Sequence, residues 1–240
     1  MAFLEFSGIK KRYGESCILN NVSFEIKEGE VFGLIGRSGC GKSTFLKILV
    51  GMVRADDGKI LFDGKDAIKD INYLRASTGF ATQENMLFDE LSTKENSFYF
   101  GKLYGMKSKE IRANFEQLID LLELNGYEDV LAKNLSGGMI KRANILVSLI
   151  HKPKFLILDE PTVGLDPGLR RVLWGYIHEV HKTGTTILVT SHLLEEIEAN
   201  CDKIAILSKG DIVSVGNPQE YRNIYKKLES FNEIFEEIAK

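Results

Sequence analysis

The stretch Gly36-Arg37-Ser38-Gly39-Cys40-Gly41-Lys42-Ser43 decides the fold of this chain. It matches G-x-x-x-x-G-K-[ST] in full, and it lies between an apolar run, residues 30–35, and a stretch with helical spacing, residues 42–50. Glycines let a loop wrap closely around phosphates with its N–H groups pointing inward, and the following helix adds the positive end of its dipole. The motif therefore predicts an α/β fold that binds nucleotide phosphates, with Lys42 on the β and γ phosphates and the Ser43 hydroxyl on Mg²⁺. A dinucleotide-binding fold is disfavoured, because no G-x-G-x-x-G pattern runs through these glycines.

Two carboxylates, Asp159 and Glu160, follow the continuous apolar run of residues 155–158. Such a run is typical of a strand buried on both faces, and ligands of open parallel sheets bind beyond the carboxyl ends of the strands. We expect Asp159 to support Mg²⁺ through its water shell and Glu160 to polarise the attacking water. Alone, the pair could also form a solvated acidic turn, and the phosphate loop favours the catalytic interpretation.

The rest of the chain predicts where the sheet and the helices lie. Apolar runs at residues 186–189 and 203–207, with helical stretches between them, indicate a mainly parallel sheet. Near the N-terminus, Val22, Phe24 and Ile26 alternate with polar residues, and Asp63-Gly64 is a strong hairpin signal, so an antiparallel β subdomain is expected.

Residues 84–152 have a helical pattern instead. A stripe at helical spacing predicts a buried face there: Ile111, Phe115, Leu118, Ile119 and Leu122. We expect a single domain, 1–240, with a core lobe of residues 1–83 and 153–216, an inserted helical subdomain over 84–152, and a helical tail over 217–240.

Composition narrows the class of protein. The chain has 240 residues, 44% hydrophobic and 27% charged, with a formal net charge of −3, which argues against a dedicated nucleic-acid binder. Cys17, Cys40 and Cys201 are odd in number and widely spaced, a pattern typical of reduced thiols rather than of a disulfide framework or a zinc site. The first residues do not look like a signal peptide, and no apolar run approaches the ~18 residues of a membrane helix, so a membrane role is expected only through a partner.

A third motif, Asn134-Leu135-Ser136-Gly137-Gly138-Met139, precedes a run expected to be helical over residues 140–150. A serine followed by glycines at a helix start can bind an anion, or it can simply cap the helix. With this motif in place, the order of elements from Phe3 to about Gly216 resembles the nucleotide-binding domain of ABC transporters. Residues 36–44 match its Walker A loop, Leu135 to Gly138 match its signature, and Asp159 and Glu160 match Walker B and the catalytic glutamate. The remaining matches are Tyr13 (the adenine-stacking aromatic), Gln83 (the Q-loop), Asp166 in Gly164-Leu165-Asp166 (the D-loop) and His192 (the switch histidine).

The resemblance implies a P-loop NTPase core of the RecA-like type that hydrolyses ATP with Mg²⁺. It implies the following roles: catalysis by Glu160, His192, Gln83 and Lys42; metal binding by Ser43, Gln83 and Asp159; and nucleotide binding by Tyr13, Gly36, Arg37, Ser38, Gly39, Cys40, Gly41, Lys42, Ser43, Thr44, Ser136, Gly137, Gly138 and Asp166. Met139 departs from the glutamine that commonly ends the signature. Three features are similar to those of the ATPases of simple ABC-2-type exporters: Met139, the Gly-Leu-Asp-Pro stretch at residues 164–167 and the short segment after Gly216.

The resemblance also implies partners. It predicts a head-to-tail dimer with a second nucleotide-binding domain, either a copy or a paralogue, in which Ser136 of one subunit completes the site of the other. It further predicts an integral membrane permease subunit, a location in the cytoplasm on the inner face of the cell membrane, and no direct contact with nucleic acid. Met86, Leu87, Phe88 and Leu91 follow Gln83 and could line a groove for a permease helix or form buried core.

Several alternatives stay open at this level. Tyr13 could be an ordinary aromatic at a strand edge, Gln83 a surface polar residue, and His192 a residue that merely follows a helix cap at Ser191. A soluble ABC ATPase acting on nucleic acid or ribosomes is the alternative function, but such relatives usually carry two cassettes or a long coiled coil, and this sequence has one phosphate loop and no sustained heptads. A non-enzymatic nucleotide-gated module is disfavoured by Glu160 and His192.

Overall fold

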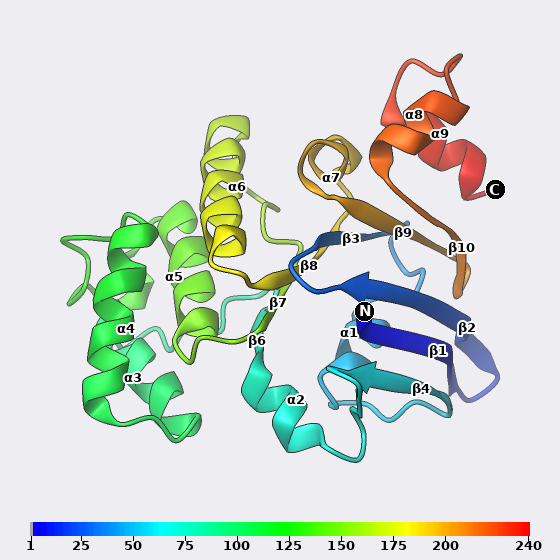
Figure 1. Cartoon of the computed structure of the whole chain (residues 1–240). Helices are drawn as coiled ribbons and strands as arrows, with labels where there is room; N and C mark the ends of the chain where they lie inside the picture. Colours follow the sequence, from blue (N-terminus) through cyan, green and yellow to red (C-terminus); the bar gives the residue numbers. More distant parts are fainter. Residues whose placement is uncertain (1) are drawn as a thin grey trace. The chain divides into compact units, whose positions relative to one another are not determined.

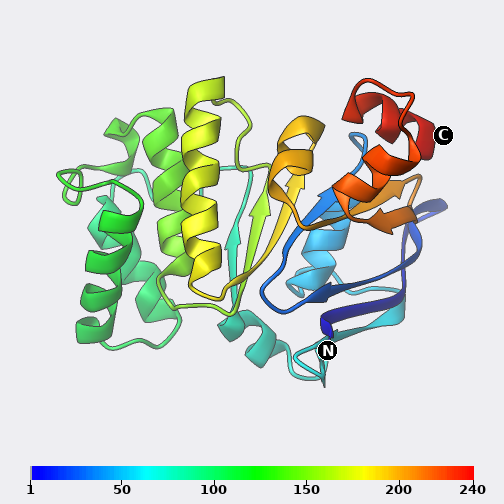
Figure 2. The same cartoon turned by 45° about the horizontal axis from the view of Figure 1, so that its top comes forward.

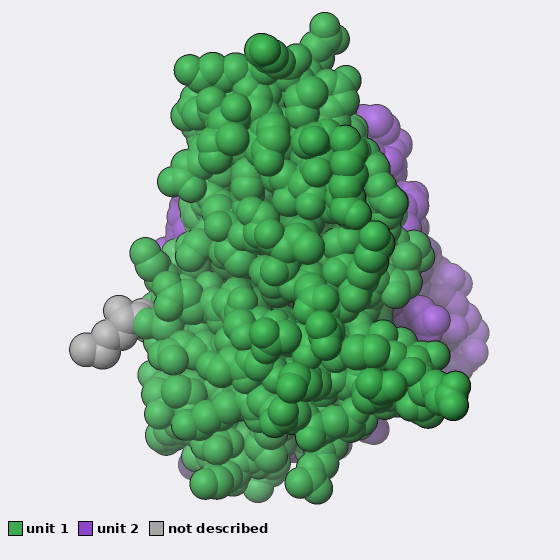
Figure 3. Space-filling model, turned by 90° about the vertical axis from the view of Figure 1, so that its right-hand side faces the viewer, with its two compact units in different colours: residues 1–75, 186–240 green, residues 76–185 purple. Residues whose placement is uncertain are grey.

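The computed structural model describes residues 2–240, which divide into two compact units. Unit 1 consists of residues 1–75 and 186–240, and unit 2 of residues 76–185 (Figure 3). Helix α2, Ile71–Ser77, carries the chain from the first unit into the second.

Unit 1 contains an antiparallel sheet with the strand order β2-β1-β4-β5; Figure 1 labels β2, β1 and β4 of this sheet. The strands are β1, Ala2–Tyr13; β2, Ser16–Lys27; β4, Asp57–Phe62; and β5, Lys65–Asp66. The period-two pattern of β2 is confirmed, because Val22, Phe24 and Ile26 are buried and their neighbours are exposed. The hairpin signal is confirmed as well: Asp63 and Gly64 have φ angles of 51° and 72°, as a tight turn between β4 and β5 requires.

Unit 1 also contains parallel strands. Strand β3, Val31–Ile35, pairs in parallel with β8, Thr186–Ser191, and with β9, Lys203–Ser208, while β10, Asp211–Gly216, pairs antiparallel with β9. Every residue of β3 and β8 is buried, which explains why both read as continuous apolar runs. Four helices accompany these strands: α1, Lys42–Leu49; α7, Leu194–Asn200; α8, Pro218–Ile224; and α9, Phe231–Ile238.

Unit 2 combines two parallel strands with helices. Strand β6, Thr78–Ala81, pairs with β7, Phe155–Asp159. The helices are α3, Thr93–Leu103; α4, Ser108–Leu121; the 3-10 turn η1, Ala132–Asn134; α5, Gly137–Leu149; and α6, Pro167–Lys182. Helices α3, α4 and α5 lie side by side in both ribbon views (Figures 1 and 2).

The predicted buried stripe of α4 is confirmed at Ile111, Phe115, Ile119 and Leu122, whereas Leu118 is only partly buried. The α/β fold class is confirmed too, with mainly parallel core strands and a separate antiparallel sheet. Within residues 2–240, none of the helices combines the length and the apolar character that crossing a bilayer would require.

Candidate active site

The phosphate loop connects β3 to α1 in unit 1 and depends on its glycines. A Cβ atom at Gly36 would lie 2.4 Å from the Leu207 carbonyl oxygen and 2.5 Å from the Cys40 sulfur, so only glycine fits there. Gly39 and Gly41 have φ angles of 77° and 115°, which favour glycine. Gly41 is also the N-cap of α1 and offers no side-chain oxygen, so no cap side chain occupies the first N–H groups of the helix. These N–H groups are the kind of donors that bind an anion.

Lys42 bends back over this loop. Its ammonium donates to the Gly36 carbonyl at 2.6 Å and, more weakly, to the Arg37 carbonyl at 3.4 Å. The hydroxyl-bearing neighbours follow directly, with Ser43 exposed and Thr44 partly exposed. Phosphate oxygens that enter the loop would therefore replace carbonyl oxygens as partners of Lys42.

The outer residues of the loop contact other parts of unit 1. The Arg37 guanidinium pairs with the Glu236 carboxylate of α9. Burial raises the pKa of the Cys40 thiol and the Lys42 charge opposes that rise, so Cys40 packs as a protonated side chain beside Gly36. Ser38 and Gly39 are exposed at the tip of the loop.

Strand register places His192 at the same sheet edge as the phosphate loop. Ile35 of β3 pairs with Ser191 of β8, so Gly36 and His192 both follow directly after paired residues of neighbouring parallel strands. His192 is exposed. The Ser191 hydroxyl accepts the Leu193 N–H at 3.0 Å, and the N-cap of α7 is Leu193, so Ser191 is not the cap of this helix.

Tyr13 stands at the end of β1 with an exposed ring, and the Lys11 ammonium lies 5.3 Å from the ring centroid. An exposed ring is what a base-stacking residue and an ordinary edge aromatic have in common. Stacking of Tyr13 on adenine therefore stays a prediction.

In unit 2 the strand register places the predicted Q-loop residue Gln83 near the predicted Walker B residue Asp159. Ala81 of β6 pairs with Leu158 of β7, so Gln83 and the pair Asp159 and Glu160 emerge at one edge of these two strands. Glu160 is only 8% exposed and has a φ of 50°, a left-handed conformation that costs free energy for a residue with a side chain. Strained backbone of this kind concentrates at functional sites.

The signature residues form the start of α5. This helix begins at Gly137, three residues before the predicted start, because the Ser136 hydroxyl caps it by accepting the Met139 N–H at 3.4 Å. Ser136 therefore caps the helix, which is one of the two roles that the sequence allowed for it. A hydroxyl also carries one proton, so a capping Ser136 can still donate to an anion. A Cβ atom at Gly138 would lie 3.4 Å from the Leu169 side chain, while Gly137 has open space around it.

Asp166 is the N-cap of α6 and accepts the N–H groups of Gly168 at 2.9 Å and Leu169 at 3.1 Å. Gly164, two residues earlier, has a φ of 81°, which turns the chain into this cap. The Asp166 carboxylate therefore has a structural role in the free chain, which the D-loop motif alone did not predict.

The side chains proposed for Mg²⁺ are hard oxygen donors, the Ser43 hydroxyl and the Asp159 carboxylate, with the Gln83 amide as a third. Over residues 2–240, no group of three His, Cys, Asp or Glu side chains is close enough to form a metal site of its own. Mg²⁺ commonly keeps several waters and binds one or two protein oxygens together with substrate phosphates. This donor set fits that mode of binding. The ion, when bound, would neutralise phosphate charge.

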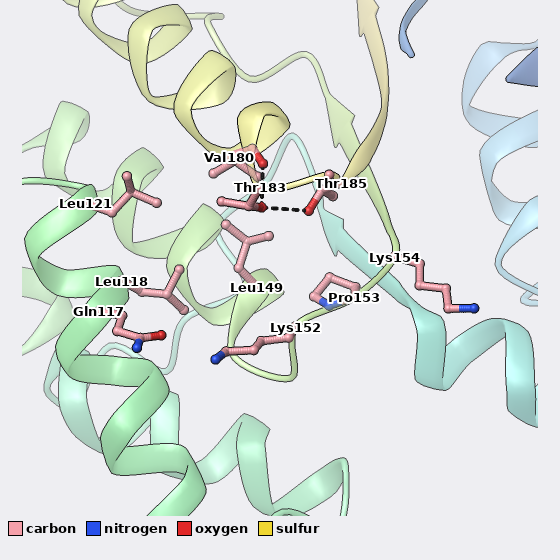
Figure 4. A pocket seen from close by; sticks show the side chains of 11 residues that line it. Gln117, Leu118, Leu121, Leu149, Lys152, Pro153, Lys154, Val180, Thr183 and Thr185 are labelled. Atoms are coloured by element: carbon pink, nitrogen blue, oxygen red, sulfur yellow. Dashed lines mark hydrogen bonds between the residues drawn. The ribbon is translucent and has the colours of Figure 1, made fainter. Parts of the chain in front are cut away.

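A separate hollow of about 440 Å³ lies in unit 2 (Figure 4). Apolar side chains of α4, α5 and α6 line it, with the hydrogen-bonded hydroxyls of Thr183 and Thr185 3.3 Å apart on one side. The segment Lys152 to Lys154, which also lines it, precedes β7, so the hollow lies at the opposite end of that strand from Asp159. It explains the partial exposure of Leu118 and is distinct from the candidate active site.

Two residues near Gln83 were not predicted. The Lys141 ammonium donates to the Gln83 carbonyl at 2.8 Å, and the Asn144 side chain accepts the Met86 N–H at 3.0 Å. Both contacts span 58 positions of the chain. Sequence patterns carry no signal for a pair this far apart.

Comparison with known proteins decides the family. The family model described as ABC transporter matches residues 19–163, more than half of the chain. The chain belongs to the ABC transporter family. Proteins of this family bind ATP.

Relatives of this ABC domain match its sequence over most of its length. It is 37% identical over 213 residues to the linearmycin resistance ATP-binding protein LnrL of Bacillus subtilis (strain 168), covering 89% of this chain and 68% of the relative. It is 35% identical over 215 residues to the Nod factor export ATP-binding protein I of Rhizobium sp. (strain N33), covering 90% of this chain and 71% of the relative.

Solved structures show the same fold. An ATP-binding subunit of an ABC transporter superposes with a TM-score of 0.88 at 26% identity, covering 99% of this chain and all of that one. The structure of cbiO1 from Clostridium perfringens, part of the ABC transporter complex cbiONQ, superposes with a TM-score of 0.84 at 29% identity, covering 98% and 99% of the two chains.

Proposed function

We propose that this chain is the ATP-hydrolysing subunit of a membrane ABC transporter that exports its substrate. The observation that carries the proposal is that parallel strands deliver the motif residues to common sheet edges. In unit 1 they deliver the phosphate loop and His192, and in unit 2 they deliver Gln83, Asp159 and Glu160. The relatives named for linearmycin resistance and Nod factor export support the direction of transport.

Each residue has a distinct task in the proposed hydrolysis. The glycine loop and Lys42 hold the phosphates, and Tyr13 stacks on adenine. Ser43, Asp159 and Gln83 are the proposed ligands of Mg²⁺ and its water shell. Glu160 accepts the proton of the attacking water, a task that suits a carboxylate shielded from solvent. His192 contacts the γ phosphate and so reports whether it is present.

The proposed reaction needs a second copy or a paralogue. Ser136, Gly137 and Gly138 form an anion site in unit 2 that lies outside the phosphate loop in sequence, and we assign them to the ATP of the partner subunit. An exposed apolar patch supports this assignment: Leu169 is 41% exposed and Val172 46%, and Leu169 lies beside Gly138. Exposed apolar patches next to a functional motif often mark protein interfaces.

The proposed contact with a permease lies on unit 2. Leu87 is buried, as the core alternative requires, but Phe88 is 46% exposed and packs edge to face on the exposed Tyr99 with a centroid distance of 4.7 Å. Leu103, on the same helix as Tyr99, is exposed as well. Aromatic and aliphatic side chains presented together suit the apolar face of a partner helix. This contact would hold the domain, as one ABC unit over 1–240, on the cytoplasmic face of the membrane.

The test is to express the chain at its native locus with an affinity tag and to identify what copurifies. We expect a polytopic membrane protein, and we expect Phe88→Glu to reduce its recovery while Lys109→Glu, on an exposed site of α4, does not. Recovery of ribosomes or nucleic acid without a membrane protein would replace the transporter proposal with the soluble ABC ATPase.

A further inference from the structure

The helix that carries the signature also holds the main chain of the Q-loop. Lys141 and Asn144 are three residues apart on α5, so they share one face of the helix. Lys141 donates to the Gln83 carbonyl at 2.8 Å. The Asn144 amide donates to the carbonyls of Glu84 and Thr82 at 3.3 and 3.5 Å, and its oxygen accepts the Met86 N–H at 3.0 Å.

These hydrogen bonds matter because the Q-loop segment, residues 82–86, lacks the regular main-chain hydrogen bonds of a helix or strand. Several main-chain groups of these residues bond to side chains of α5 instead. Asn144 is 2% exposed, so its hydrogen bonds are shielded from water and costly to leave unmade. The conformation of the Q-loop is thus set by side chains of α5.

Lys141 also lies within electrostatic reach of Walker B. Burial lowers the pKa of the Lys141 ammonium, and the Asp159 carboxylate acts in the opposite direction. A lysine on the solvent face of a helix would feel neither effect. This partly buried cation therefore holds the Q-loop main chain from a helix that begins at the Ser136 cap.

We propose that Lys141 is a positioning residue of the ATPase reaction: it fixes the Gln83 main chain to the signature helix, so that a shift of α5 moves the Q-loop with it. The inference rests on the proposed hydrolysis and adds a residue outside the established motifs. Occupation of Ser136 by the ATP of a second copy would then be felt at Gln83, since both are attached to the same rigid helix. The proposal gives Lys141 no role in holding ATP on the phosphate loop, because its hydrogen-bond partner is the Gln83 carbonyl.

The experiment compares three lysine variants in the full chain. Lys141→Met keeps the length of the side chain without charge or donor, Lys141→Arg keeps both, and Lys109→Met is a matched control at an exposed site of α4. For each variant we would measure the steady-state kcat and KM for ATP, the ATP dissociation constant, the melting temperature, and hydrogen exchange of the peptide that spans residues 82–88.

We expect Lys141→Met to lower kcat roughly tenfold, the effect of losing one hydrogen bond to a charged group, with KM and the dissociation constant changed less than about twofold. Exchange in residues 82–88 should become faster, Lys141→Arg should restore most of kcat and of the protection, and Lys109→Met should match the parent.

Parent-like kcat and exchange in Lys141→Met would overturn the positioning role and leave the proposed ATPase untouched. Lys141 would be only a structural residue under two conditions. The fall in melting temperature of Lys141→Met would have to account for its whole loss of activity, and Lys141→Arg would have to restore none of that activity. A parent chain without turnover would overturn the proposed hydrolysis, and the exchange data would still decide whether Lys141 holds the Q-loop.

Discussion

Replacing Lys42 by alanine tests how the phosphate loop binds its ligand. In the free chain the Lys42 ammonium donates to the Gly36 carbonyl at 2.6 Å, and this bond must be given up when phosphate enters. Attraction between unit charges 4 Å apart is about 4 kcal/mol at an effective dielectric constant of ~20. Losing a hydrogen bond made by a charged group costs about 1.5–3 kcal/mol. Subtracting the cost of the lost carbonyl hydrogen bond from the attraction to phosphate leaves about 1–2.5 kcal/mol as the net contribution of Lys42 to binding. Lys42→Ala should therefore weaken ATP binding roughly 5- to 70-fold.

The assay is a calorimetric titration with MgATP at fixed ionic strength, because charge interactions of exposed groups are screened by salt. Lys47→Ala is the matched control, since Lys47 is exposed on the last turn of the same helix. The dissociation constant of Lys47→Ala should match the parent. A Lys42→Ala dissociation constant within about twofold of the parent would refute the assignment of Lys42 to the phosphates.

Three further changes test other parts of the structure. Burial lowers the pKa of His151 from about 6.5 to about 4, against the smaller rise caused by the hydrogen bond that its Nε2 donates to the Thr78 carbonyl at 3.2 Å, so the unfolded chain binds the proton more readily. The contribution of neutral His151 to the free energy of unfolding is complete above pH 6.5, and roughly 3 kcal/mol of it is lost as the pH falls toward 4. Denaturant unfolding of His151→Gln should therefore show a free energy of unfolding that depends less on pH over this window. Gly36→Ala should destabilise the chain by about 1–3 kcal/mol and impair ATP binding, because the new methyl would lie 2.4 Å from the Leu207 carbonyl; unchanged denaturation midpoints would contradict this packing. Leu169→Asp should reduce ATP-dependent dimer formation in analytical ultracentrifugation with an unaltered melting temperature, and an undiminished dimer would remove this patch from the interface.

The parts that could be predicted from the sequence are those encoded locally. The phosphate loop is a strand, a glycine turn and a helix in one stretch, so its fold follows from neighbouring residues. The buried strands β7, β8 and β9 appear as apolar runs because both faces are covered, and the Asp63-Gly64 turn needs positive φ angles that these residues tolerate. The register that brings His192 to the edge where the phosphate loop begins follows from parallel pairing of such runs.

What could not be predicted depends on contacts between distant segments or on competing local bonds. The early start of α5 comes from a weak cap at Ser136, and the cap at Asp166 competes with any ligand for the same carboxylate. Leu118 fits the helical stripe but borders a hollow that only the packed helices create. Lys141 and Asn144 reach the Q-loop across 58 positions, and no pattern in the sequence links the two segments.

In the proposed reaction Glu160 drives hydrolysis in a site completed by a second subunit. The most direct test of this proposal is Glu160→Gln, studied by ATPase rate and by mass in solution with and without ATP. We predict that the variant binds ATP, loses at least about a hundredfold in turnover, as removal of a general base does, and accumulates as a dimer only when ATP is present. Near-normal turnover would contradict the role of Glu160, and a monomer at saturating ATP would contradict a second copy of this chain as the partner.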